Sequence, residues 1–261
     1  MPEDPVLLSE QNGAVLALTL NRPKANAFDL TLIDALLEAL RRAEAESSVR
    51  CVLLTGAGRV FSAGQDVTVI AATEGRVSFR RHLERTYNRL ILRMRRLEKP
   101  IVAAINGAAA GAGLGIALAT DIRIAGRSAR FVFGFTGIGL TADSATSLTL
   151  PSMIGLGRAS EMAFTNDPLS AEQALAFGLV NRVVDDYQLM AQAGALAADL
   201  AQGPTRALGL TKRAFNRARL AELESTLDYE AYLQEVAGGT EDHAEGVKAF
   251  LEKREPKFRG M

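Results

Sequence analysis

Two loops rich in small residues hold backbone groups that could take part in chemistry. Residues 61–66 (FSAGQD) and residues 106–115 (NGAAAGAGLG) each follow an apolar run. Small side chains let a ligand approach the backbone, and N–H groups at the start of a helix bind anionic oxygen atoms. Two such loops facing each other would form an oxyanion hole. Taken singly, each loop is more simply explained by turns and close packing.

Asp143 is the third candidate, in residues 138–146 (IGLTADSAT), where a helix is expected to begin. Position alone favours an N-cap, in which the carboxylate accepts a hydrogen bond from a backbone N–H. A carboxylate beside an apolar pocket would instead have a raised pKa and could move protons. Phe131, Phe133 and Phe135 fit such a pocket, and they fit core packing equally well.

The sequence holds few other reactive side chains. It contains one cysteine, Cys51, and two histidines, His82 and His243. A single cysteine excludes an intrachain disulfide and a thiolate metal cage. A zinc site or a Ser-His-Asp triad would have to use the two histidines, which we expect on solvated helix faces. Cys51 is expected to be a small buried hydrophobe, so carboxylates and backbone N–H groups remain.

A dinucleotide site is another interpretation of residues 106–115. Its fingerprint needs a third glycine three residues after Gly113, where this chain has Ile116. It also needs a strand that ends close to the first glycine, whereas the expected strand ends several residues earlier. The sequence therefore gives this interpretation little support.

Charge and hydropathy exclude two classes of partner. The 30 basic and 30 acidic side chains give a formal net charge of zero, whereas nucleic-acid binding needs a basic surplus. A local basic pocket for a small anion is still compatible with this balance. The longest apolar stretch, near residues 101–110, is far shorter than the ~20 residues that span a bilayer. Since the amino terminus does not resemble a signal peptide, we expect a cytoplasmic protein.

Alternating strands and helices must position these loops. The expected elements are a hairpin of residues 6–9 and 14–20 around an Asn-Gly turn, a helix capped by Asp29, strands at 51–55, 101–105, 121–124 and 131–132, a long helix near 78–97 and a short one at 116–120. This order is typical of an α/β protein with largely parallel sheets covered by helices. Beyond Gly203 and Pro204 only helical patterning continues.

Six motifs together carry a resemblance to a known family: LNRP at 20–23, FSAGQD at 61–66, PIVAAING at 100–107, AGAG at 110–113, FGLVN at 177–181 and EDHAEGVKAFLEK at 241–253. In this order, from about residue 5 to the end, the chain resembles the enoyl-CoA hydratase/isomerase (crotonase) family. The resemblance implies a crotonase (ClpP-like) spiral of ββα units over residues 1–203. It also implies a helical C-terminal trimerisation region over 204–261, and a homotrimer or dimer of trimers.

The resemblance also implies an acyl-CoA thioester as substrate, with no cofactor because CoA is part of that substrate. The family's two oxyanion-hole N–H donors fall on Gln65 and Ala112. Lys253 would supply the local positive charge for the CoA phosphates. The positions that match CoA contacts are Lys24 and Ala25, in a loop one residue shorter than usual, with Ala63, Asp66, Phe250 and Lys253.

Departures from the family pattern bear on the reaction. The two glutamates of a typical hydratase fall on Gly115 and Phe135, neither of which can do acid–base work. Asp143 matches the aspartate of the 2-(1,2-epoxy-1,2-dihydrophenyl)acetyl-CoA isomerases of phenylacetate degradation. It also matches the nucleophilic aspartate of 4-chlorobenzoyl-CoA dehalogenases. The resemblance therefore gives Asp143 an acid–base role in place of a cap.

The acyl pocket separates these two groups. The dehalogenases' histidine falls on Asn88, and their tryptophans fall on Tyr87 and Phe135, in a chain with no Trp. The resemblance therefore favours an isomerase, in which Asp143 moves a proton while a thioester enolate is held by backbone N–H groups. The alternatives are an enoyl-CoA hydratase, a Δ3-Δ2-enoyl-CoA isomerase of fatty acids, an aryl-CoA dehalogenase and a non-catalytic acyl-CoA-binding protein.

Overall fold

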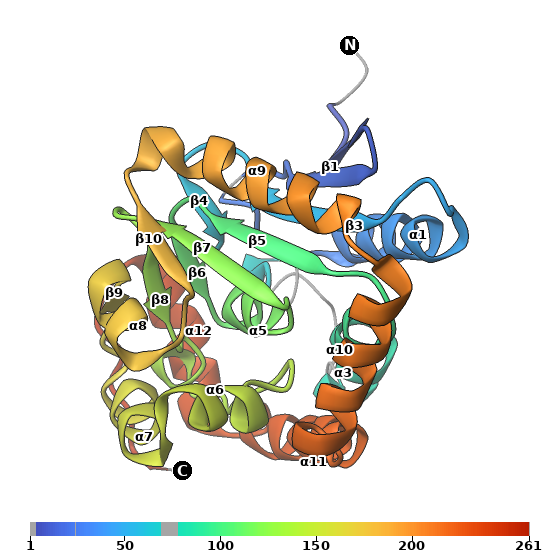
Figure 1. Ribbon diagram of the computed structural model, residues 1–261. Helices are drawn as coiled ribbons and strands as arrows, with labels where there is room; N and C mark the ends of the chain where they lie inside the picture. The colour runs from blue at the N-terminus through green and yellow to red at the C-terminus, as the bar shows by residue number, and fades with distance from the viewer. Residues whose placement is uncertain (1–3, 24, 69–77, 261) are drawn as a thin grey trace.

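Two largely parallel sheets organise the computed structural model, which describes residues 4–23, 25–68 and 78–260 (Figure 1). The larger sheet has the strand order β1-β2-β3-β5-β7-β10, and only the β1–β2 hairpin is antiparallel. That hairpin was predicted from the Asn-Gly turn. The strands are β1 (Leu7–Asn12), β2 (Val15–Leu20), β3 (Cys51–Gly56), β5 (Ile101–Ile105), β7 (Ile122–Gly126) and β10 (Arg182–Val184).

The smaller sheet, β4-β6-β8-β9, follows the larger one step by step. Strands β3, β5 and β7 are each followed within a few residues by β4, β6 and β8, which pair in the same order. Each step advances the chain by one strand in both sheets, so the core is the spiral expected from the sequence. The strands are β4 (Val60–Ser62), β6 (Ala108–Ala110), β8 (Arg130–Val132) and β9 (Leu169–Ser170).

Helices cover both faces of the larger sheet, which is why β3 and β5 are continuous apolar runs. The side chain of Cys51 packs with α9 (Leu189–Gln202), which lies across one face (Figure 1). The next side chain, Val52, joins the main core on the other face together with α1 (Leu30–Ala45). Asp29 caps α1 as predicted, because its Oδ1 accepts a hydrogen bond of 2.9 Å from the Leu32 N–H.

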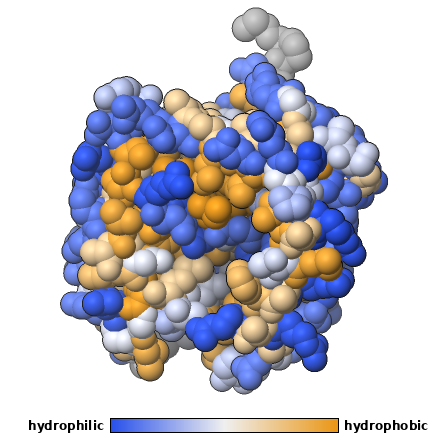
Figure 2. Space-filling view, in the orientation of Figure 1, coloured by the Kyte–Doolittle hydropathy of each residue, from blue (hydrophilic) through white to orange (hydrophobic). Residues whose placement is uncertain are grey.

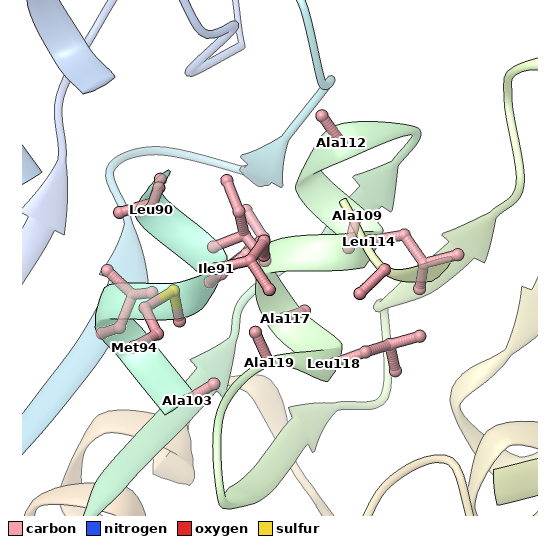
Figure 3. Close-up of a cluster of buried hydrophobic side chains, with 14 of the residues drawn as sticks. Leu90, Ile91, Met94, Ala103, Ala109, Ala112, Leu114, Ala117, Leu118 and Ala119 are labelled. Atoms are coloured by element: carbon pink, nitrogen blue, oxygen red, sulfur yellow. The ribbon is translucent and has the colours of Figure 1, made fainter. Parts of the chain in front are cut away.

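Helix α5 (Ala112–Leu118) is buried along its whole length. It begins four residues before the position expected from the sequence, because Gly111 turns the chain at φ +53°. A Cβ atom at Gly113 would lie 2.7 Å from the carbonyl oxygen of Ser62, so only glycine permits this approach to the neighbouring loop. Figure 3 shows α5 side chains beside those of α4 (Tyr87–Arg96), among them Leu90, Ile91, Met94, Leu114, Ala117 and Leu118.

The long helix predicted near residues 78–97 is two helices. Helix α3 (Phe79–Arg85) ends and α4 begins at Thr86, whose backbone leaves the helical region at φ −118° and ψ −94°. The Thr86 hydroxyl donates a hydrogen bond to the carbonyl oxygen of His82. The break lets the two helices take different directions, so α3 packs against a C-terminal helix while α4 packs against α1.

The C-terminal region is helical, as predicted. It contains α10 (Thr205–Arg219), α11 (Leu223–Ala237) and α12 (Glu241–Glu252). Helix α11 packs against α3, α4 and α6 (Thr146–Ile154), and α12 packs against η1 (Thr136–Ile138), so the region lies against the spiral core. The division of the chain at residue 203 stays a prediction.

Shorter helices follow the later strands: η1 (Thr136–Ile138), α6 (Thr146–Ile154), α7 (Leu156–Thr165), α8 (Ala171–Phe177) and η2 (Asp186–Gln188). Throughout the described parts of the chain, every helix is too short or too polar to cross a bilayer.

Candidate active site

A cavity of about 460 Å³ lies between the spiral core and the C-terminal helices. It is lined by both glycine-bearing loops and by Asp143. Apolar side chains form much of its wall, and they come from α3, η1 and the last helix: Phe79, Leu83, Ile138 and Val247. The structure therefore brings together the three features that the sequence singled out.

The two loops are in direct contact. Gly64 has φ +87°, and a Cβ atom there would lie 2.7 Å from the Ala110 carbonyl oxygen and 3.3 Å from the Ala112 nitrogen. Ala112 is the first residue of α5, where N–H groups lack partners within the helix. The backbone of Gln65 is therefore adjacent to the amino-terminal end of α5.

A short strand-like pairing orients the backbone at Gln65. The Phe28 N–H donates to the Gly64 carbonyl oxygen at 2.7 Å, and the Asp66 N–H donates to the Phe28 carbonyl oxygen at 2.8 Å. In such a parallel bridge the N–H of the central residue points away from the partner. The Gln65 N–H thus lies on the side of the strand opposite Phe28.

The Asp143 side chain is only 7% exposed, and the helix does not use it as a cap. Helix α6 begins at Thr146 with Ala145 as its N-cap residue. The Asp143 carboxylate accepts hydrogen bonds from the Ser144 hydroxyl (2.7 Å) and the Gln234 side-chain amide (3.1 Å). The N-cap interpretation, which position alone favoured, is wrong.

Burial raises the pKa of Asp143 to about 7. The negative charge of Glu230 adds to this rise, whereas the hydrogen bonds from Ser144 and Gln234 oppose it. A carboxyl group with such a pKa can both take up and release a proton near neutral pH.

Gly115 occupies the position of the first hydratase glutamate, and close packing there leaves no room for a side chain. A Cβ atom at Gly115 would lie 2.5 Å from the Ser144 Cβ and 2.9 Å from the Thr146 hydroxyl oxygen. A glutamate there would displace the turn that follows Asp143. At the second position, Phe135 lines the cavity and packs edge-on against Phe133, with ring centroids 5.0 Å apart.

His82 was expected on a solvated face, and that expectation is wrong. It lines the cavity, and its Nε2 lies 3.0 Å from the side-chain oxygen of Gln65. The same oxygen accepts a hydrogen bond of 2.7 Å from the Tyr87 hydroxyl. Burial lowers the pKa of His82, which favours the neutral ring. The side chain of Gln65 is therefore held by two helices, α3 and α4.

His243 was also expected to be solvated and is instead buried in the cavity wall. Its Nδ1 lies 2.8 Å from the Ile138 carbonyl oxygen, and its ring packs edge-on against Phe79. The carbonyl can only accept, so Nδ1 carries the hydrogen. Burial lowers the pKa of His243. Close packing of α12 on η1 places it here, since a Cβ atom at Gly246 would lie 2.6 Å from the Ile138 carbonyl carbon.

The residues expected to contact CoA are dispersed. Ala63, Asp66 and Phe250 line the cavity, and Phe250 is 58% exposed. Ala25 and Lys253 are exposed, both at positive φ, and neither lines the cavity. Lys24 lies outside the described residues.

Two further candidate residues, Asp66 and Asn88, make specific contacts within the protein. The Asp66 carboxylate pairs with Arg22 at 2.7 Å and accepts a hydrogen bond of 2.6 Å from the Thr68 hydroxyl. Of the three residues expected to line an acyl pocket, Tyr87 and Phe135 line this cavity and Asn88 does not. The Asn88 amide donates a hydrogen bond of 3.1 Å to the Leu227 carbonyl oxygen on α11, so it faces that helix.

Sequence reasoning missed the residues that α11 contributes. Gln234 lines the cavity and bonds Asp143, and Glu230 bonds the turn beyond it. A helical pattern alone gives no signal for such contacts, because the partners lie 85 and 91 residues away along the chain.

A second cleft, of about 470 Å³, lies between α10 and the core. Its buried charged side chains already have partners, since Asp121 lies 2.9 Å from both Arg95 and Lys212, and the Arg123 guanidinium donates to the Thr120 and Leu179 carbonyl oxygens. Within the described residues, no group of three or more His, Cys, Asp or Glu side chains could hold a metal ion. The candidate chemistry is therefore concentrated in the cavity at Asp143.

Comparison with known proteins gives a consistent answer. The family model for enoyl-CoA hydratase/isomerase matches residues 10–261. The 1,2-epoxyphenylacetyl-CoA isomerase of Escherichia coli (strain K12) is 44% identical, over 97% of this chain and 98% of that protein. The 4-chlorobenzoyl coenzyme A dehalogenase-2 of an Arthrobacter species is 36% identical, over 94% of this chain and 90% of that protein.

A solved structure confirms the crotonase fold predicted from the sequence. The enoyl-CoA hydratase from Mycobacterium avium subsp. paratuberculosis K-10 superimposes with a TM-score of 0.88 at 34% identity, covering 97% of this chain and 98% of that chain. Family model, relatives and fold all span almost the whole sequence. The chain is an enzyme that belongs to the enoyl-CoA hydratase/isomerase family.

Proposed function

We propose that this enzyme isomerises acyl-CoA thioesters, using Asp143 as its single acid–base group and the N–H groups of Gln65 and Ala112 as an oxyanion hole. The observation that carries the proposal is a buried carboxyl group, with a pKa of about 7, in one cavity with two adjoining backbone loops. Asp66, the other carboxylate among the described lining residues, is paired with Arg22. Of these two carboxyl groups, Asp143 is therefore the one able to exchange a proton.

The double-bond shift needs no net proton. The Asp143 carboxylate takes a proton from Cα, and the electron pair of that C–H bond moves to the thioester oxygen as an enolate. The N–H groups of Gln65 and Ala112 hold the oxygen while it is negative. The protonated Asp143 then returns the proton to Cγ as the enolate collapses. One carboxyl group is enough because the proton is moved and not consumed.

The substrates we propose are ring-1,2-epoxyphenylacetyl-CoA and 3-enoyl-CoA esters. The identity of 44% to an isomerase named for the first compound supports this choice. The cavity wall supports it too, because Tyr87 and Phe135 offer aromatic surfaces to a planar acyl group. For the epoxide, the same enolate stabilisation would assist the ring rearrangement.

Six residues are proposed to meet CoA. Phe250 supports this directly, as an exposed ring at the cavity that could pack on the thioester's pantetheine arm. Lys253, in the exposed turn after α12, would face the phosphates, in the same subunit or in a neighbouring one. The complete proposed set is Lys24, Ala25, Ala63, Asp66, Phe250 and Lys253.

We also propose a homotrimer or a dimer of trimers. Figure 2 shows hydrophobic residues gathered on the face that carries α9, β7 and β10, interrupted by hydrophilic ones. Several large apolar side chains are exposed, including Leu156, Phe164 and Tyr187 at 72%, 82% and 82%. Such surfaces favour burial against further copies of the chain.

Replacement of the proposed base tests the function. We expect Asp143→Asn to abolish conversion of 3-enoyl-CoA to 2-enoyl-CoA, with a loss of ~10³-fold or more, because Asn cannot accept the proton. Binding of the CoA ester, followed by calorimetry, should change little. The matched control is Asp199→Asn, on the exposed side of α9, which should leave turnover unchanged. Turnover of Asp143→Asn at the wild-type rate would exclude Asp143 as the base.

Hydration of 2-enoyl-CoA is the second candidate, because the family model and solved relatives include hydratases. The packing at Gly115 opposes the two-glutamate route. Assays with crotonyl-CoA, a 3-enoyl-CoA and 4-chlorobenzoyl-CoA on one preparation separate hydration, isomerisation and dehalogenation. Binding of all three without turnover would indicate a non-catalytic acyl-CoA-binding protein.

A further inference from the structure

Helix α11 presents two buried side chains, one helical turn apart, to the segment that carries Asp143. Gln234 donates to the Asp143 carboxylate at 3.1 Å and accepts a hydrogen bond of 3.3 Å from the Thr141 N–H. Glu230 and Gln234 are 2% and 1% exposed. The proposed active-site base is therefore held from the C-terminal helical region as well as from its own loop.

The turn that follows Asp143 has an unfavourable backbone. Ser144 and Ala145 are consecutive residues with Cβ atoms at φ +57° and φ +60°. The left-handed region is costly for such residues, so two in succession persist only where the surroundings hold them. This turn also aims the Ser144 hydroxyl at the Asp143 carboxylate, at 2.7 Å. The conformation of the turn and the orientation of the carboxylate are thus linked.

Glu230 supplies the hydrogen bonds that hold this turn. One carboxylate oxygen accepts from the Ala145 N–H at 2.8 Å. The other accepts from the N–H and the hydroxyl of Ser147, at 2.9 Å and 2.5 Å. These groups lie at the start of α6, whose own N-cap residue, Ala145, has no side chain that could cap it. A residue of α11 therefore does what a local N-cap would do.

We propose that Glu230 is a positioning residue for the isomerase reaction, holding the strained turn 143–147 and placing its charge beside Asp143. The inference rests on the proposed role of Asp143 as the base. Glu230 does not line the cavity, so it would act through Asp143 and not on the substrate. The C-terminal region then has a part in the chemistry beyond any role in assembly.

The charge of Glu230 stands out among the groups near Asp143. The charge raises the pKa of Asp143, in the same direction as burial. Burial also raises the pKa of Glu230 itself, and the hydrogen bonds from Ser147 and Ala145 oppose that rise. The two histidines facing the cavity have pKa values lowered by burial, and burial raises the pKa of Tyr87, so all three favour their neutral forms. The titratable groups that face Asp143 from the surrounding elements are Glu230 on α11, His82 on α3, Tyr87 on α4, His243 on α12 and the Asp66–Arg22 pair.

Three substitutions separate the effect of the Glu230 charge from the effect of its side-chain length. Glu230→Gln keeps the length but removes the charge, so the titration of Asp143 should move to lower pH. Glu230→Asp keeps the charge but shortens the side chain, so kcat should fall while the titration stays near its wild-type position. Glu230→Ala removes both, and kcat should fall by ~10²-fold because the turn is released, with KM little changed.

Two readouts follow these changes: carbon NMR of the Asp143 carboxyl in the resting enzyme, and the acid limb of the kcat/KM profile for a 3-enoyl-CoA. Glu224→Gln is the control, because Glu224 is on the same helix, exposed, and paired with Arg96. It should change neither. Circular dichroism and size exclusion identify any variant that fails to fold.

An Asp143 titration that is unmoved in folded Glu230→Gln, with unchanged turnover, would overturn the inference. The NMR readout needs no turnover, so it stands apart from the test of function. If the titration moves while Asp143→Asn keeps its turnover, the proposed function fails, and the catalytic part of this inference fails with it.

Discussion

The two halves of the candidate active site, the pair of glycine-bearing loops and the turn at Asp143, are built in different ways. The two glycine-bearing loops, residues 61–66 and 106–115, belong to consecutive ββα units, and close contacts at Gly64 and Gly113 bring them together. Asp143 lies in a strained turn that is held from α11: Glu230 accepts from Ala145, 85 residues earlier in the chain, and Gln234 donates to Asp143, 91 residues earlier. The first half depends on local backbone geometry within the spiral. The second depends on the docking of a helix from the C-terminal region.

The difference explains what kind of change each half tolerates. A backbone N–H cannot be altered by ordinary side-chain substitution, so the two glycine-bearing loops should keep the proposed N–H donors in place as long as their glycines are kept. A carboxylate is easily replaced, and its pKa depends on every charge and hydrogen bond around it. We therefore expect variation in the reaction to arise at Asp143 and its supports, with the oxyanion loops unchanged.

For the two glycine-bearing loops, the largest expected effect on kcat comes from removing a backbone N–H donor. Ala112→Pro deletes the N–H at the first position of α5, where proline fits a helix well. We expect kcat to fall by ~10²–10³-fold, as proposed for loss of an oxyanion-hole donor, together with some loss of stability, because the proline ring adds atoms beside the close contact between Gly64 and the Ala112 nitrogen. Steady-state kinetics and thermal unfolding measure the two effects.

The matched control places proline at the start of another helix. Leu156→Pro changes the first residue of α7, which also follows a glycine at positive φ and is exposed. Its turnover should equal that of the wild type. Equal activity of both variants would remove Ala112 from the oxyanion hole.

For the half of the site that contains Asp143, we expect a specific dependence of the rate on pH. The base must be ionised to take the Cα proton, and its pKa is raised from 3.8 to about 7. The kcat/KM for a 3-enoyl-CoA should therefore fall about tenfold per pH unit below this pKa and level off above it. A profile that stays flat down to pH 5 would show that Asp143 titrates as an ordinary exposed aspartate, or that another group is the base.

The smallest predicted effect tests whether the glycine-bearing loop at Gln65 also depends on a side chain from a distant helix. Tyr87→Phe removes the hydroxyl that donates to the Gln65 side chain and leaves the His82 contact in place. Loss of one such hydrogen bond costs about 1 kcal/mol, so we expect a several-fold decrease in kcat. A fall as large as that of Ala112→Pro would mean that the Gln65 loop depends on α4 as strongly as Asp143 depends on α11.

The sequence predicted the local elements well because their signals are local. The β1–β2 hairpin, the Asp29 cap of α1 and strand β5 at Ile101–Ile105 all agree with the structure. The two glycine loops were recognised from their composition, and their expected proximity is observed.

Features that depend on tertiary packing were not predictable in the same way. The helix break at Thr86 allows α3 to follow α11, and nothing in the helical pattern marks it. His82 and His243 were expected in solvent because a helix pattern cannot tell which polar face another element will cover. Asn88 was placed in the acyl pocket by resemblance, whereas its amide is used by a backbone carbonyl of α11.

The central claim is that one carboxyl group carries the proton from Cα to Cγ. A single-turnover reaction with a 3-enoyl-CoA deuterated at Cα, in ordinary water, tests this most directly. Because Asp143 is only 7% exposed, part of the deuterium should be retained and appear at Cγ of the 2-enoyl product, as detected by mass spectrometry and NMR. A product whose new Cγ hydrogen comes wholly from solvent would contradict transfer by a single buried carboxyl group.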